Sequence, residues 1–239
     1  MLSPITFKFL EAVKINNNTE WMHKNHDLYV QERNRFSSLV ESLLIDMQKI
    51  DSSLSDISAK ECIYRFNKDL RFMTDKSHPY KLHFWAFLCS WGRKSSLPWY
   101  YLHIQPWNLS MVGGWTRCPS KNEANRIRLY IWEHWEEWLE LTENKMFKSY
   151  FWSVQWKDNV DAERRMKTKA WKMLLESAWE KVARKIVSDR DMIEIFAYHS
   201  WTVSHTLTDD DVLSDKGYEI VIDWFKKIKK LNDFLSNVL

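Results

Sequence analysis

The sequence predicts an α+β fold, in which an antiparallel sheet of about five strands packs against several helices in a single domain over residues 1–239. Two observations predict this class. Apolar residues recur at helical spacing in 4–50 and 215–236, whereas residues 62–115 alternate between polar and apolar side chains as strands do. The predicted strands of 62–115 are joined by short connections, which favour antiparallel neighbours because parallel strands need long crossovers.

The N-terminal part is predicted to form two helices. The first covers residues 4–15, because Pro4 suits a first helical turn and the asparagines at 16–18 end the helix. Thr19 is a suitable cap for the second helix, which is predicted to continue to about residue 50. The composition of residues 51–56 predicts a loop. The apolar stripe of the second helix consists of Phe36, Leu39, Val40, Leu43, Leu44 and Met47.

The rest of the chain is predicted to hold the strands and the remaining helices. Strands are expected near residues 62–67, 83–90, 99–105, 109–115 and 201–206. Helices are expected over most of 119–187, near 190–198, at 209–213 and over 215–236. Ser120 and Glu123 have the spacing of a capping box.

Motifs spread over nearly the whole chain resemble one known family. They are Asn16-Asn17-Asn18 with Glu20-Trp21, the series Arg65, Asp69, Arg71, Asp75 and Lys76, then Pro79-Tyr80-Lys81, Tyr100–Pro106 and Thr202–His205 with Asp209–Asp211. The chain is similar here to domain of unknown function 2461. This resemblance implies a single α+β domain and implies no particular activity. The chain departs from the family pattern in three places. It has one extra residue before Pro79, and the glycines that the family has after Pro106 are replaced by other residues. The family's Pro-Lys-Gly turn before the late acidic stretch reads Ala183-Arg184-Lys185-Ile186 here.

Composition excludes several classes of protein. The net charge is +3 from 35 basic and 32 acidic residues, so a nucleic-acid partner would need a local basic patch. No apolar run approaches the roughly 20 residues that span a bilayer, and the N-terminus lacks the pattern of a signal peptide. The chain has three cysteines, Cys62, Cys89 and Cys118, an odd number that cannot all form disulfides within the chain, and none of them is part of a CxxC motif. We therefore expect a cytoplasmic protein with reduced thiols and no membrane association.

Tryptophan is unusually frequent and glycine unusually rare. The chain has 15 Trp and 4 Gly, whereas average usage predicts about 17 Gly. Trp91, Trp99, Trp107 and Trp115 stand where turn glycines are expected, beside Pro or Gly. One hypothesis is that the sequence is an altered or engineered version of one with glycine at these positions. The alternative is a natural core that is rich in tryptophan.

Residues 64–81 form the strongest candidate site. If they are extended, Arg65, Asn67, Asp69 and Arg71 share one face, and Tyr64, Phe66, Leu70 and Phe72 share the other. Arginine forks suit phosphate and carboxylate groups, and lysines add point charges. The ligand-binding candidates are Arg65, Asp69, Arg71, Lys76, Tyr80, Lys81, Tyr101 and His103.

Three functions remain open. The leading one is binding, or processing, of a phosphate-bearing or other anionic small molecule, with His103 or Asp69 as the acid or base of any reaction. The first alternative is an interaction or scaffold protein whose arginines and aspartates only pair with one another, and the second is nucleic-acid binding through the lysines of 226–230. Neither His103 nor His205 is part of a metal-ligand pattern such as HExxH or HxH. The sequence also contains no phosphate-binding loop, dinucleotide-binding fingerprint or nucleophile elbow. We therefore expect no metal and no cofactor. The sequence predicts no oligomeric state.

Overall fold

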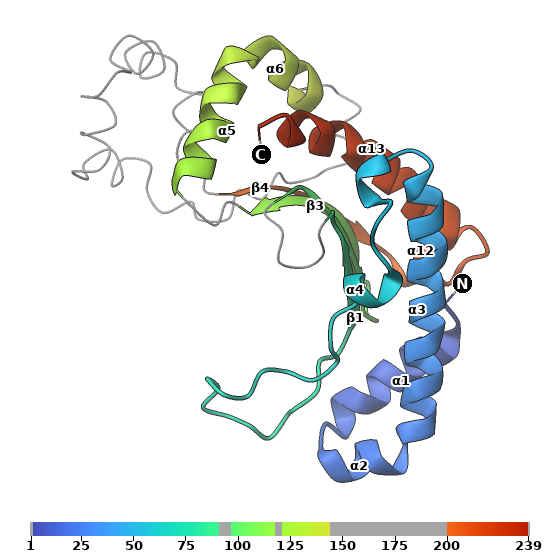
Figure 1. Ribbon diagram of the computed structural model, residues 1–239. Coiled ribbons are helices and arrows are strands. Elements are labelled where there is room, and N and C mark those ends of the chain that lie inside the picture. Colours follow the sequence, from blue (N-terminus) through green and yellow to red (C-terminus); the bar gives the residue numbers. More distant parts are fainter. Residues whose placement is uncertain (1, 91–96, 118–120, 144–199, 239) are drawn as a thin grey trace.

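A computed structural model of the chain describes residues 2–90, 97–117, 121–143 and 200–238 (Figure 1). These residues form helices and a four-stranded antiparallel sheet, which confirms the α+β class. Within these residues, no helix combines the length and the apolar character that crossing a membrane requires. Trp91, Ser120, the predicted helix near 190–198 and the later part of the helical region 119–187 lie outside them.

Three helices form the N-terminal part: α1 (Pro4–Ile15), α2 (Thr19–Lys24) and α3 (His26–Gln48). The first prediction is confirmed, but the continuous helix predicted from residue 19 is wrong because it breaks at Asn25. The side-chain amide of Asn25 donates to the carbonyl oxygen of Trp21 at 2.9 Å. Such local bonds compete with a regular helix, and the backbone of Asn25 leaves the helical region at φ −112° and ψ 22°.

The sheet contains β1 (Phe84–Leu88), β2 (Trp99–Ile104), β3 (Ser110–Arg117) and β4 (Ser200–Leu207), in the spatial order β1-β2-β3-β4. Four of the predicted strands are therefore confirmed, and all neighbours are antiparallel as expected. The register places Trp85 opposite His103 and Phe87 opposite Tyr101. In the next pair of strands Tyr101 lies opposite Gly113.

The strand predicted at residues 62–67 is wrong. A short 3-10 turn, η1 (Ser52–Leu54), and a one-turn helix, α4 (Ala59–Cys62), precede this segment, which then makes only isolated bridges from Ile63 to Ala86 and from Asn67 to Tyr80. Between these bridges, side chains bond two of the backbone carbonyls that a regular strand would pair with a neighbouring strand. The guanidinium group of Arg33 donates to the carbonyl oxygen of Tyr64 at 2.8 Å, and the ammonium group of Lys81 donates to that of Arg65 at 2.7 Å.

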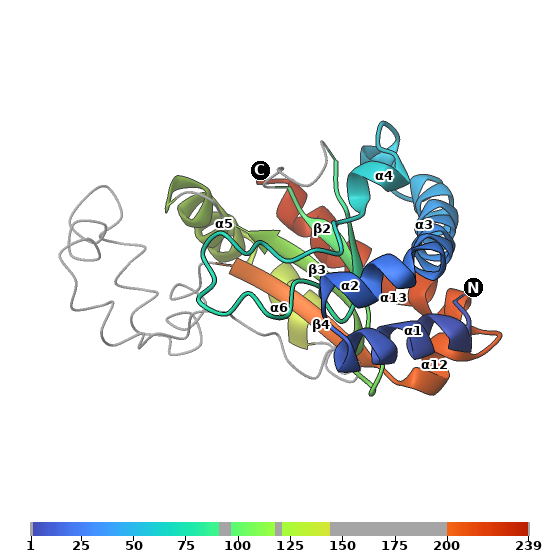
Figure 2. The same cartoon turned by 90° about the horizontal axis from the view of Figure 1, so that it is seen from below.

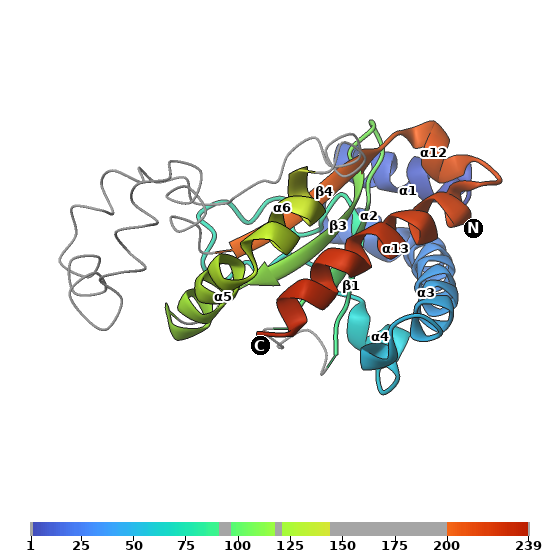
Figure 3. The same ribbon diagram turned by 90° about the horizontal axis from the view of Figure 1, so that it is seen from above.

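The last part of the described chain holds α5 (Lys121–Glu133), α6 (Trp135–Glu143), α12 (Asp209–Leu213) and α13 (Gly217–Ser236). The predicted helices at 209–213 and 215–236 are confirmed. Figure 3 shows α13 lying across the strands. Gly114 allows this close approach, because a Cβ atom there would lie 2.2 Å from the side chain of Ile228 in α13. Trp138 of α6 is buried against Phe234 of the same helix α13, with ring centroids 5.5 Å apart.

The main core lies between one face of the sheet and helices α1, α3 and α13, which Figure 1 shows on the same side of the sheet. Alternate strand residues supply the sheet's part of this core, as the period of two predicts. Because these helices cover one face, the side chains of the other face are available for a different role. The side chains of this core include Phe9, Phe36, Phe84, Tyr100, Leu102, Val112, Phe225 and Leu235.

Candidate functional site

The candidate ligand residues lie on a loop, residues 64–83, and on the sheet face that the core helices leave uncovered. Figures 1 and 2 show this loop leaving the sheet on the side opposite α3. Its two arms are joined by backbone hydrogen bonds from Lys68 to the carbonyl of Pro79 (2.8 Å) and from Lys81 to that of Phe66 (3.0 Å). Asn17 anchors the returning arm, because its side chain bonds both the carbonyl oxygen (3.0 Å) and the N–H (2.9 Å) of Tyr80.

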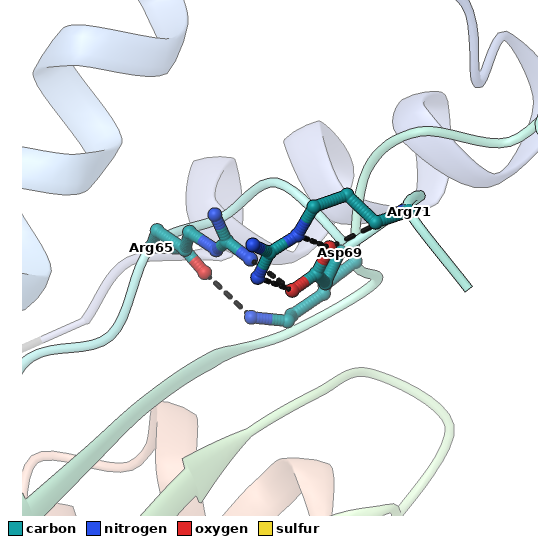
Figure 4. A network of polar contacts seen from close by, with 4 residues as sticks. Arg65, Asp69 and Arg71 are labelled. Atoms are coloured by element: carbon teal, nitrogen blue, oxygen red, sulfur yellow. Dashed lines mark hydrogen bonds and ion pairs between the residues drawn. The ribbon is translucent and has the colours of Figure 1, made fainter. Parts of the chain in front are cut away.

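Asp69 joins two of the predicted arginines (Figure 4). Its carboxylate accepts from Arg71 Nε at 2.9 Å and Nη2 at 2.7 Å, and lies 3.2 Å from the guanidinium of Arg65. Arg71, through these bonds and then its charge, and Arg65 hold the pKa of Asp69 well below its usual range. The carboxylate therefore stays ionised, which suits a charge partner better than an acid or base. The three side chains form an exposed network, and exposed ion pairs stabilise a fold only weakly.

Lys81 connects the loop with the first strand of the sheet. Its Nζ donates to the carbonyl oxygen of Arg65 and lies 4.8 Å from the ring centroid of Trp85 in β1. Burial, and then the charges of Arg65 and Arg33, lower the pKa of Lys81 to about 8. Among the described residues, no ion pair links Lys81 to a carboxylate.

An aromatic face borders this lysine. We use this name for Tyr64, His83, Trp85, Phe87, Trp99, Tyr101 and His103, which are linked by ring contacts on the side of the sheet away from α13. The rings of Tyr64 and Trp85 are 4.2 Å apart, as are those of His83 and His103. The loop therefore meets the sheet through aromatic contacts.

The ring of His103 lies between the side chains of Tyr101 and Gln105, two residues before and two residues after it in the chain. The hydroxyl of Tyr101 lies 2.8 Å from Nδ1, and Nε2 lies 2.9 Å from the amide oxygen of Gln105. Because that oxygen only accepts, Nε2 carries the hydrogen and Nδ1 accepts from Tyr101. Burial lowers the pKa of His103 and raises that of Tyr101. In the neutral ring both nitrogens of His103 are therefore bonded to these two side chains.

His83 lies between the loop and β1. Burial, and then the nearness of His103 and Lys81, lower the pKa of His83 to about 3. It is therefore neutral at pH 7. Sequence reasoning missed both His83 and Trp85, although the alternation His83, Trp85, Phe87 carries the period of two that marks one strand face.

The structure brings some predicted site residues together and separates others. Arg65, Asp69, Arg71, Lys81, Tyr101 and His103 form a continuous series with the aromatic face. Tyr80 instead points into the main core, where its ring stacks on that of Phe66 at 6.0 Å. Lys76 is exposed at the far part of the loop. The expected common face of Tyr64, Phe66 and Phe72 is wrong, since Tyr64 contacts the aromatic face, Phe66 is in the main core and Phe72 is 89% exposed.

The other candidates have local partners. His205 stacks on Trp224 of α13 with centroids 3.8 Å apart, so it packs against the helix that covers the opposite face. In the described part of the chain, no three His, Cys, Asp or Glu side chains gather as a metal site would require. Cys62 and Cys89 are buried thiols, as expected.

Comparison with known proteins identifies the family. No curated protein and no solved structure matches this chain. Residues 5–234 match a family described as a conserved hypothetical protein, DUF2461, which covers both the charged loop and the sheet. The chain therefore belongs to the DUF2461 family.

Proposed function

We propose that this protein binds a phosphate-bearing or other anionic small molecule where Lys81 meets the aromatic face. The observation that carries this proposal is the ammonium group of Lys81, which is half-buried beside Arg65 and pairs with no carboxylate among the described residues. A partly buried ammonium group of this kind is stabilised when an anion binds beside it, in the position that a carboxylate partner would otherwise occupy. The guanidinium groups of Arg65 and Arg71 both lie at the carboxylate of Asp69, and together they give this part of the loop an excess of positive charge.

The neighbouring side chains suit the rest of such a ligand. Trp85 and Tyr64 offer ring surfaces beside Lys81, and neutral His83 and the hydroxyl of Tyr101 offer polar contacts. Small-molecule sites commonly combine aromatic walls with a few polar groups. We propose that the protein acts in the cytoplasm, because its three cysteines have no spacing that indicates disulfide pairs.

The test compares two lysines of the same loop. Thermal unfolding is measured with inorganic phosphate, nucleotides, sugar phosphates, short oligonucleotides and uncharged sugars, on the parent, Lys81→Gln and the exposed control Lys76→Gln. A ligand at 100 times its Kd stabilises the native state by about 2.7 kcal/mol. We expect a phosphate-bearing ligand to raise the Tm of the parent and of Lys76→Gln, and to lose most of that shift in Lys81→Gln.

The pH dependence adds an independent check. Because the pKa of Lys81 is about 8, the lysine is mostly charged at pH 7 and loses its charge as the pH rises through 8. The affinity for the anion is therefore expected to fall between pH 7 and 9. An equal Tm shift in Lys81→Gln and the parent, or no shift with any compound of the panel, contradicts the proposal.

The Asp69 network favours a second function, that of an interaction protein whose charges hold the loop in shape. In that case Arg71→Ala lowers the Tm and no anion changes it. Nucleic-acid binding has less support, because Lys226 and Lys229 of α13 lie 3.8 Å from Asp223 and 2.6 Å from Asp233. An oligonucleotide whose Tm shift falls steeply with salt would favour it over the small anion.

A further inference from the structure

The turn between β2 and β3 contains a tryptophan in a backbone conformation that favours glycine. Trp107 has φ 69° and Asn108 has φ 55°, and these are the non-glycine residues with positive φ in the described part of the chain. Hairpin turns with positive φ at both central residues are built mainly from Asn, Asp and Gly. Asparagine tolerates this region, whereas for a bulky side chain such a φ is a genuine outlier.

Neighbouring groups fix this conformation. The carboxylate of Asp209 accepts hydrogen bonds from the backbone N–H of Trp107 at 3.0 Å and from that of Asn108 at 2.8 Å. The side-chain oxygen of Asn108 accepts in return from the N–H of Asp209 at 2.8 Å. The hydroxyl of Ser110 closes the turn by bonding both the N–H and the carbonyl oxygen of Gln105. Moving residue 107 to negative φ would break these bonds.

The indole ring of Trp107 does not explain the choice of tryptophan. The ring is only partly buried, and its contact is the ammonium group of Lys14 at 4.0 Å from the ring centroid. Trp21 differs, since it lies within α2 and its ring packs on that of Phe9 with centroids 6.2 Å apart. The backbone at position 107 therefore favours glycine, whereas the one at position 21 favours a residue with a side chain.

We propose that glycine is the natural residue at position 107, where the backbone favours it. The counts of 15 Trp and 4 Gly point the same way. A replacement of this kind has a simple cause, because a UGA codon is read as tryptophan in some genetic codes and as glycine in others. This inference does not depend on the proposed ligand.

The backbone requirement is tested by comparing glycine with alanine at two positions. Both residues lack the indole ring, so their difference isolates the backbone. We expect the unfolding equilibrium constant of Trp107→Gly to be roughly threefold to tenfold smaller than that of Trp107→Ala. At the helical control the order reverses, with Trp21→Gly roughly fivefold easier to unfold than Trp21→Ala. Equal stability of the two variants at position 107 overturns the proposal.

The identity of the natural residue is tested directly. The codons are determined in the source gene, and the peptide that contains residue 107 is weighed by mass spectrometry from the protein of the source organism. We expect UGA at 107 and UGG at 21, and a peptide mass with glycine at 107. A UGG codon at 107, or a peptide mass with tryptophan there, overturns the proposal.

Discussion

Asn17 is the residue through which the N-terminal helices position the charged loop, and its replacement gives a sharp test. The side chain is 7% exposed and makes two hydrogen bonds to the backbone of Tyr80, the residue before Lys81. Asn17→Ala leaves a buried N–H and a buried carbonyl without partners. Each lost partner costs about 1–3 kcal/mol, so we expect the free energy of unfolding to fall by about 2–6 kcal/mol.

The neighbouring Asn16 is the matched control. Its side chain bonds only the carbonyl oxygen of Ala12 in its own helix, at 3.0 Å, so we expect Asn16→Ala to cost about 1 kcal/mol or less. Urea denaturation gives both values, and hydrogen exchange of the Tyr80 amide reports on the anchor itself. If Asn17→Ala and Asn16→Ala have equal stability and equal exchange at Tyr80, the loop is not held in the way described.

Two further predictions concern packing and pH. Gly114→Ala places a Cβ atom against Cγ2 of Ile228 and is expected to destabilise the protein by about 1–3 kcal/mol in urea denaturation. Ile228→Ala removes Cγ2, so a Gly114→Ala change that costs as much in the Ile228→Ala background as in the parent would contradict this contact. The folded pKa of His83, about 3, lies below its unfolded value near 6.5, so the unfolded state binds the proton first and stability is lost as the pH falls from 6.5 toward 3. Denaturation at several pH values is expected to show a flatter profile for His83→Asn, and an unchanged profile would refute the burial of this ring.

Regular elements with a clear period were predictable. The alternation in 99–105 and 109–115 and the helical stripe of 215–236 correspond to β2, β3 and α13, because burial of one face imposes the period directly. The same alternation at 62–67 predicted a strand that does not form. There, Arg33 and Lys81 bond the backbone carbonyls of Tyr64 and Arg65. The partners of such bonds lie far apart in the chain, so local periodicity does not contain them.

In the candidate site, too, one part was predictable from the sequence and another was not. The sequence by itself determined the residue types, namely a series of arginines, lysines and aspartates in 65–81 and a tyrosine–histidine alternation in 101–103. The tertiary structure decided which of them lie together. It pairs the ionised Asp69 with two arginines, turns Tyr80 into the core and brings Lys81 onto Trp85 beside His83. The physical reason is that side-chain type is local, whereas burial and charge pairing depend on which distant segments pack against one another.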